Sequence, residues 1–129
     1  MERYAIKPWE ELTIRDDYMF KLIMRRKRIC KKLLERTLRM KIREIRYLET
    51  EKSMKSQYSS KGIRLDVYVR DEKETVYNIE MQVRRLEGYA LFKRTRYYQS
   101  MMDADLLAAG ADYDDLNKTI IIFICPFDP

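Results

Sequence analysis

The sequence predicts an α/β domain in which a mixed central sheet is flanked by helices. Two observations carry this prediction. Residues 62–83 alternate between apolar and polar side chains on both sides of a charged turn, which is typical of a β-hairpin. Residues 87–107 have helical spacing and separate this hairpin from a short apolar run at 119–125. A crossover helix between two strands of one sheet makes those strands parallel, so the sheet contains both orientations.

The first residues are expected to be irregular. Residues 1–12 lack a clear period, and we expect Pro8 and Trp9 to dock on the surface of the domain. Thr13 and Asp16 have the spacing of a capping box, in which side chains satisfy the free N–H groups of a helix start. A helix is therefore predicted to begin at this point.

Two helices rather than one are predicted for the basic N-terminal part. One apolar stripe covers residues 19–23 and a second covers residues 33–38. The run Arg25–Arg28 between them contains no apolar residue, so a break is expected near Arg26. The predicted helices are 14–24 and 28–39.

The remaining elements follow from weaker local patterns. Residues 44–52 alternate and predict a first strand, whereas the Ser-rich residues 52–61 predict a polar loop. Gly110 stands where the helix 87–107 should end. After a loop at 112–117, the apolar run is expected to form a buried strand that Pro126 closes.

The hairpin brings three polar side chains together. If the turn is centred near Lys73, Asp66 lies opposite Glu80, and Gln82 shares the same face because alternate residues of a strand point the same way. Facing residues of antiparallel strands are about 4.5–5.5 Å apart, so both carboxylates could reach one hard divalent cation. The alternative is that Asp66 and Glu80 are ordinary solvated residues on an open face of the sheet.

Composition and charge favour a polyanionic partner. The chain has 129 residues, enough for one domain spanning 1–129, and its net charge is +6. Residues 15–46 carry thirteen Lys and Arg against four acids, whereas residues 103–128 are acidic. A basic segment of this size favours nucleic acid first and a membrane surface second; the alternative is a helix face that is merely solvated.

Missing residue types exclude several function classes. The sequence has no His, so it cannot form a Ser-His-Asp triad or a His-metal nuclease site, and its three Gly do not make a phosphate-binding loop. Cys30 and Cys125 are expected to be free thiols in a reducing compartment. No signal peptide or membrane span is recognised in the sequence, so the expected location is the cytoplasm of a prokaryote.

Five sequence blocks, in this order, resemble a known nuclease family: DDYMFKLI, RLDVYV, VYNIEMQ, KRTRYYQSMMD and IIIFICPFDP. Together they span about residues 14–129. They are similar to the recombination-promoting nucleases and transposases of the PD-(D/E)XK superfamily. The resemblance implies a restriction-endonuclease-like αβββαβ core, the same order of elements as the one predicted above. It also suggests that the chain ends early relative to the family.

The resemblance assigns site residues position by position. The first metal carboxylate falls on Asp66, the second on Glu80, and the superfamily's terminal Lys position on Gln82. The acid of the first helix falls on Asp17. The basic and aromatic pairs of the second helix fall on Lys93, Arg94, Tyr97 and Tyr98.

The implied activity is metal-dependent endonuclease cleavage of DNA with Mg²⁺ or Mn²⁺. Asp66 and Glu80 would bind the ion, with the main-chain carbonyl of Met81 as a third ligand, and Gln82 would orient a water. Asp17 would hold a metal-bound water or a second ion, unless it only stabilises the start of its helix.

Other residues would contact DNA. The resemblance places phosphate contacts at Lys93 and Arg94, and the run Arg25, Arg26, Lys27 and Arg28 would steer DNA; both sets could equally be solvated faces. Tyr97 and Tyr98 are expected in the core. The alternatives to a nuclease are a weak or inactive DNA-binding remnant and a protein-interaction remnant. Sequence specificity and oligomeric state, a homodimer included, remain open.

Overall fold

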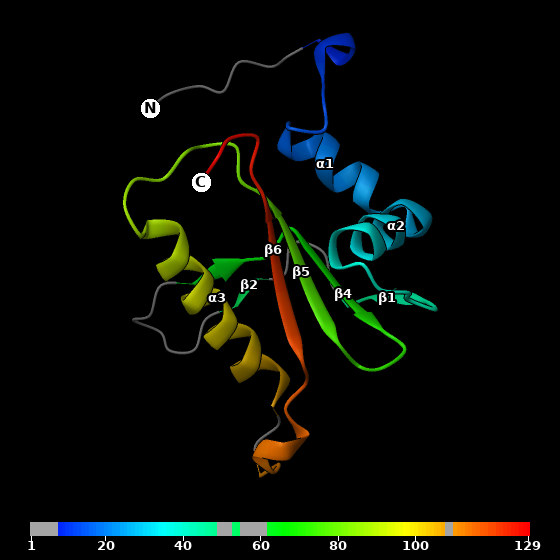
Figure 1. Cartoon of the computed structure of the whole chain (residues 1–129), viewed down its shortest axis with the longest axis vertical. Coiled ribbons are helices and arrows are strands. Elements are labelled where there is room, and N and C mark those ends of the chain that lie inside the picture. Colours follow the sequence, from blue (N-terminus) through cyan, green and yellow to red (C-terminus); the bar gives the residue numbers. More distant parts are fainter. Residues whose placement is uncertain (1–7, 49–52, 55–61, 108–109) are drawn as a thin grey trace.

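The structure, a computed structural model, describes residues 8–48, 53–54, 62–107 and 110–129. Within these residues it contains three α-helices, a four-stranded sheet and a separate two-stranded sheet (Figure 1). None of the described helices has the length and hydropathy needed to cross a membrane. The architecture is the predicted α/β class with a mixed sheet.

The helices and strands follow one another in an order close to the predicted one. The short 3₁₀ helix η1 (Trp9–Glu11) precedes the two N-terminal helices, and η2 (Tyr113–Asp115) precedes the last strand. The α-helices are α1 (Asp17–Met24), α2 (Lys27–Leu38) and α3 (Ala90–Leu106). The strands are β1 (Ile45–Tyr47), β2 (Ser53–Met54), β3 (Ile63–Arg64), β4 (Val67–Asp71), β5 (Val76–Met81) and β6 (Thr119–Ile124).

The main sheet has the order β1-β4-β5-β6. β4 pairs antiparallel with both β1 and β5, whereas β6 pairs parallel with β5 after the crossover through α3. In the hairpin Val67 faces Ile79, which is the register predicted from the turn. The open end of the hairpin, where β4 begins and β5 ends, therefore brings Asp66 next to Glu80.

Both faces of this sheet are covered (Figure 1). Val67, Val69, Tyr77 and Ile79 pack in a core cluster with residues of α1, α2 and β1. The alternate residues Tyr68 and Val76 belong to a second cluster with α3. Because side chains alternate across a strand, Asn78 and Glu80 of β5 lie on the face that α3 covers, and both are buried. The interpretation of Asp66 and Glu80 as residues of an open, solvated face is therefore wrong.

The first strand of the hairpin is interrupted, whereas the sequence predicts a continuous strand. β3 pairs with β2 in the small sheet, and the chain bends at Asp66 before β4 joins the main sheet. At the bend the N–H of Asp66 donates a 2.6 Å hydrogen bond to the carboxylate of Glu80, fourteen residues later in the chain, and not to a strand partner. The prediction of one unbroken strand over residues 63–70 is therefore wrong.

The break between the first two helices is confirmed. Arg26 has an extended backbone (ψ 107°) and precedes α2 as its N-cap residue, so the basic run lies at the junction. The predicted helix start at Thr13 is wrong, because α1 begins at Asp17. The Thr13 N–H does bond the Asp16 carboxylate at 2.8 Å, but this contact closes a turn that precedes α1.

Several predicted boundaries also change. The strand predicted over 44–52 is only β1 in the described part, and residues 49–52 lie outside it; Ser53 and Met54, predicted as loop, form β2, and residues 55–61 are not described. β6 is half-buried rather than buried, because it is at an edge of the sheet. Pro8 is exposed instead of docked, and the side chain of Trp9 is outside the described part.

Candidate active site

Two carboxylates interlock at the open end of the hairpin. The Asp66 N–H donates to Oε2 of Glu80, and the Met81 N–H donates to Oδ2 of Asp66 at 3.4 Å. Each acid therefore binds the backbone of the strand that carries the other. Glu80 is only 3 % exposed, and the Asp66 side chain is 17 % exposed. This reciprocal arrangement fixes both carboxylates close together in a site with little water.

Burial and mutual repulsion favour the protonated form of these acids. The pKa of Glu80 is raised to about 8. Loss of hydration is the larger cause, and the negative charge of Asp66 is the second. The N–H bond from Asp66 and the positive charges of Arg94 and Lys21 oppose this rise. Burial, followed by the charge of Asp17, also raises the pKa of Asp66. Near neutral pH Glu80 therefore holds a proton in the absence of a cation.

Lys21 links the first helix to the pair. Its Nζ lies 3.0 Å from Oδ2 of Asp17, four residues earlier on α1, and 3.8 Å from Oδ1 of Asp66. The Asp17 side chain is 70 % exposed and belongs to the first turn of α1, where a negative charge stabilises the helix dipole. Asp17 thus reaches the site through Lys21, a residue that sequence analysis did not single out.

Gln82 is engaged at both ends of its amide. Its Oε1 accepts a 2.7 Å hydrogen bond from Nη1 of Arg94, and its Nε2 donates to the carbonyl of Arg84 at 2.6 Å. Because a guanidinium only donates and a carbonyl only accepts, this orientation of the amide is the chemically consistent one. Gln82 is 7 % exposed, so its side chain holds other parts of the chain at the edge of the site.

Arg94 is half-buried rather than solvated. Its Nη2 donates to the Tyr98 hydroxyl at 2.9 Å, one turn along α3. Its guanidinium carbon lies 5.1 Å from the centre of the Tyr98 ring and 5.6 Å from that of Phe123. The same residue also lines an open cleft of about 760 Å³ between β3 and α3. The residues around this cleft are Gly62, Ile63, Arg64, Ala90, Lys93, Arg94, Tyr97 and Tyr98.

The described residues that line this cleft carry positive charge and include no acid. Arg64, Lys93 and Arg94 are its charged residues, and Tyr97 and Tyr98 add aromatic surface. Asp66 and Glu80 do not line it, but Arg94, which does, bonds Gln82 two residues beyond Glu80. Tyr98 is buried as predicted, whereas Tyr97 is exposed, so the prediction of Tyr97 as a core residue is wrong.

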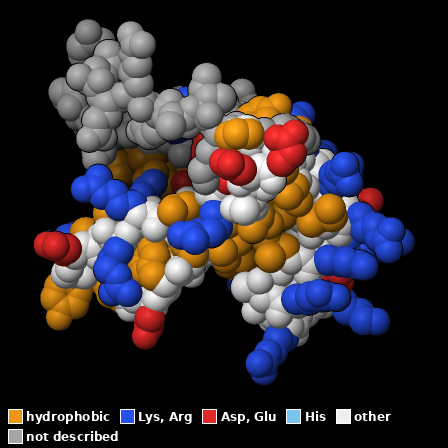
Figure 2. All heavy atoms as spheres, turned by 90° about the horizontal axis from the view of Figure 1, so that it is seen from above, with side chains coloured by type: hydrophobic (Ala, Val, Ile, Leu, Met, Phe, Trp, Pro, Cys, Tyr) orange, Lys and Arg blue, Asp and Glu red, His pale blue; other side chains and the backbone are white. Residues whose placement is uncertain are grey.

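The basic run at the helix junction differs from this cleft. Arg25, Arg26, Lys27 and Arg28 are all exposed, and none of them lines the cleft beside α3. Figure 2, which looks at the molecule from above Figure 1, shows Lys and Arg side chains on both sides of the view, over α2 and over α3. The described part of the chain therefore presents positive charge in two separate regions.

The donor set suits a hard cation that needs few protein ligands. Among the described residues no group of three or more His, Cys, Asp or Glu side chains is arranged to hold a metal. Mg²⁺ is commonly bound by one or two carboxylates, with water and substrate oxygens completing its shell, so the pair fits that ion. The Met81 carbonyl lies on the same strand edge as its N–H, which contacts Asp66, and can add a third oxygen.

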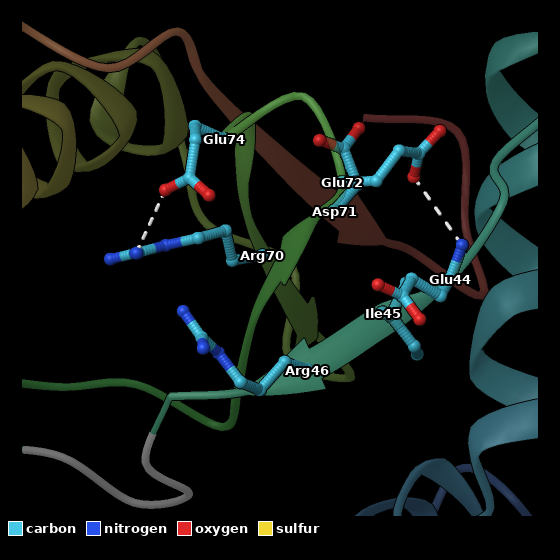
Figure 3. A pocket seen from close by; sticks show the side chains of 7 residues that line it. All are labelled: Glu44, Ile45, Arg46, Arg70, Asp71, Glu72 and Glu74. Carbon is cyan, nitrogen blue, oxygen red and sulfur yellow. Dashed lines mark hydrogen bonds and ion pairs between the residues drawn. The ribbon is translucent and has the colours of Figure 1, made fainter.

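A second pocket lies at the opposite end of the hairpin, beside its turn (Figure 3). Its volume is about 180 Å³. Arg70 pairs with Glu74 at 2.8 Å, and Glu72 accepts N–H bonds from Arg43 and Glu44. Arg70 is thus paired with an acid and Glu72 with backbone N–H groups, and none of the predicted site residues lines this pocket. The carboxylate pair and its neighbours are the better candidate.

Comparison with known proteins identifies the family of the chain. A family model described as PD-(D/E)XK nuclease family transposase matches residues 14–128, nearly the whole chain. The chain belongs to this family. No curated protein and no solved structure matches it significantly. The mixed sheet with helices on both faces is consistent with the restriction-endonuclease-like fold of PD-(D/E)XK nucleases.

In this PD-(D/E)XK nuclease-family chain, two cations near the carboxylate pair make contacts that were not predicted from the sequence. Lys21 is four residues after Asp17, a spacing that brings side chains together on a helix, so this contact could have been found. Arg94 was predicted to contact phosphates, but its contact with Gln82 depends on how α3 packs on the sheet. No local sequence signal indicates that second contact.

Proposed function

We propose that this PD-(D/E)XK transposase-family protein is a metal-dependent endonuclease that hydrolyses phosphodiester bonds in DNA. The observation that carries the proposal is the interlocked pair in which Glu80 is buried and Asp66 is half-buried; Arg94, which bonds Gln82 two residues beyond Glu80, lines a cleft rich in positive charge. Two carboxylates in low-dielectric surroundings repel each other, and a divalent cation removes that cost. The family of the chain is the independent support.

Each residue of the site would have its own role in the reaction. Asp66 and Glu80, with the Met81 carbonyl, would hold Mg²⁺ or Mn²⁺. Bound there, the ion would polarise the scissile phosphate and acidify a water. Lys21 would balance the negative charge of Asp17 and Asp66. Asp17 would hold a water or a second ion.

DNA would approach along the cleft beside α3. Arg64 and Lys93 offer positive charge to phosphates there, and the exposed ring of Tyr97 adds a surface on which a sugar or base can pack. The basic run at the junction of α1 and α2 would attract DNA over a longer range.

A DNA-binding protein without nuclease activity is the alternative. One observation favours it: Gln82 stands where the superfamily usually has Lys, and its amide is already engaged at both ends. Such a protein would retain DNA at moderate salt but leave it intact.

Cleavage of supercoiled plasmid during a titration with Mg²⁺ and Mn²⁺ separates the two functions. We expect nicked and linear products that require the metal and that disappear with chelator. Asp66→Asn serves as the control for contaminating nuclease. DNA binding without any metal-dependent cleavage would favour the alternative.

A further inference from the structure

The proposed nuclease needs positive charge at the phosphate that it cleaves, and the side chain of Gln82 is uncharged. Hydrolysis of a phosphodiester forms a bond between a water oxygen and phosphorus and breaks the bond between phosphorus and the leaving sugar oxygen. One proton of the water ends on that sugar oxygen. Negative charge builds up on the phosphate oxygens on the way, and a positioned cation stabilises it. An uncharged amide at position 82 supplies hydrogen bonds but no positive charge.

We infer that Arg94, reaching in from α3, supplies the positive charge that β5 lacks, and that Gln82 positions its guanidinium. The inference rests on the proposed function and names a further residue for that reaction. Its basis is the 2.7 Å hydrogen bond from Nη1 of Arg94 to Oε1 of Gln82, two residues beyond Glu80.

The guanidinium is held in place from several sides. Gln82 binds Nη1, the Tyr98 hydroxyl binds Nη2, and the rings of Tyr98 and Phe123 lie near its centre. Gln82 is itself held, because its Nε2 donates to the carbonyl of Arg84. A cation fixed in this way has little freedom to lose when a substrate arrives, and this is how preorganised groups stabilise a transition state.

The guanidinium also keeps donors for a substrate. An Arg side chain has five N–H donors. Arg94 uses one of them on Gln82 and one on the Tyr98 hydroxyl. Arg94 lines the cleft proposed for DNA, and its charge acts on both Asp66 and Glu80. It is therefore close enough to both the carboxylate pair and the cleft to act on a phosphate bound there. Lys could not make both hydrogen bonds with the same fixed fork.

The test compares Arg94→Gln with Arg96→Gln in single-turnover cleavage at saturating DNA and Mn²⁺. Arg96 is on the same helix, is exposed and does not line the cleft, so its variant loses the same charge away from the site. We expect Arg94→Gln to cleave at least about 100-fold more slowly, Arg94→Lys to retain part of the rate, and Arg96→Gln to stay within about 2-fold of wild type.

Binding of Mn²⁺ without DNA, measured by calorimetry, gives a readout independent of catalysis. Removing a cation near two carboxylates should leave Mn²⁺ binding as tight as before or tighter. Slower cleavage with undiminished metal binding supports the inference. Weaker Mn²⁺ binding by Arg94→Gln would overturn it, because the variant would then have damaged the metal site itself.

A double-mutant cycle tests the positioning role of Gln82. If Gln82 acts through Arg94, Gln82→Ala slows the wild-type protein but has little further effect in the Arg94→Gln background. Independent, additive losses would overturn that role. If the wild-type protein cleaves DNA and Arg94→Gln cleaves it equally fast, the inference is overturned but the proposed function stands. If the wild-type protein does not cleave DNA, the proposed function itself is overturned.

Discussion

Two groups of basic residues predicted to contact DNA have very different surroundings in the fold. The run Arg25–Arg28 is exposed at the junction of α1 and α2, whereas Arg94 is half-buried between α3 and the sheet. In the sequence both are short runs of Lys and Arg. An exposed cation interacts with DNA through water and salt, and its effect is weak and long-ranged. A cation held in low-dielectric surroundings has a strong and local effect.

This difference predicts that the exposed residues attract DNA and that the half-buried ones act in the cleavage step. The exposed run should change how tightly DNA binds, and the half-buried group and its partners should change how fast DNA is cut.

Loss of either carboxylate should abolish cleavage. We expect Asp66→Asn and Glu80→Gln each to lower the single-turnover rate by about 1000-fold or more, because each removes a charged ligand of the proposed metal. Asp71→Asn is a matched control: Asp71 is a buried acid at the other end of the hairpin, where it bonds the Tyr77 hydroxyl at 2.6 Å. This control should lower stability but not the rate of the folded protein. Near-normal cleavage by either site variant would exclude the assignment.

Gln82→Ala should lower the cleavage rate by about 10- to 100-fold with little change in DNA affinity. The variant loses the amide oxygen that holds Arg94, an interaction that serves the chemical step. Gln99→Ala is the control, since Gln99 is on α3 but bonds Thr119 away from the site. Single-turnover rates and DNA titrations of both variants decide the matter. A Gln82→Ala protein that binds DNA poorly but cuts at the normal rate would reverse the expected division between binding and cleavage.

Neutralising the exposed run should affect binding alone. With Arg25, Arg26, Lys27 and Arg28 all changed to Gln, the slope of log affinity against log salt should become shallower by about 0.9 for each phosphate that the run no longer neutralises. The rate at saturating DNA should remain within about 2-fold of wild type. Lys118→Gln removes one exposed charge before β6 and should leave the slope unchanged. An unchanged slope for the fourfold variant would show that this run does not bind DNA.

The smallest effect concerns pH, since a buried acid couples folding to protonation. The pKa of Glu80 rises from 4.5 to about 8 on folding, so the unfolded chain releases its proton first as pH increases. The metal-free protein should therefore lose stability between about pH 4.5 and 8, and Glu80→Gln should remove this loss. At pH 8 we expect the variant to melt about 5 °C above metal-free wild type, with no difference near pH 4.5.

The same shift predicts how metal binding depends on pH. A divalent cation must displace the Glu80 proton, so Mn²⁺ affinity should increase from pH 6 to 8 with release of a proton. Calorimetry in buffers of different ionisation enthalpy measures that proton. Equal affinity at both pH values would show that Glu80 is not a ligand.

The sequence alone determined the elements that local patterns control. The turn centre and the alternation of apolar residues predict that Val67 faces Ile79, since a slip of one residue would turn every side chain to the other face. The basic run predicts the break between α1 and α2 because it interrupts the apolar stripes. The position of Asp66 beside Glu80 follows from the same register.

Only the tertiary structure decided what surrounds the carboxylate pair. Alternation cannot show whether the second face of a sheet is open, and here α3 covers it, which buries Glu80 and Gln82. The bend at Asp66 depends on a hydrogen bond to a side chain fourteen residues away. Arg94 reaches Gln82 because the crossover helix packs on the sheet, a contact between segments that no local spacing encodes. Local periodicity sets strands and register, whereas long-range packing sets burial, and burial controls the charge of the site.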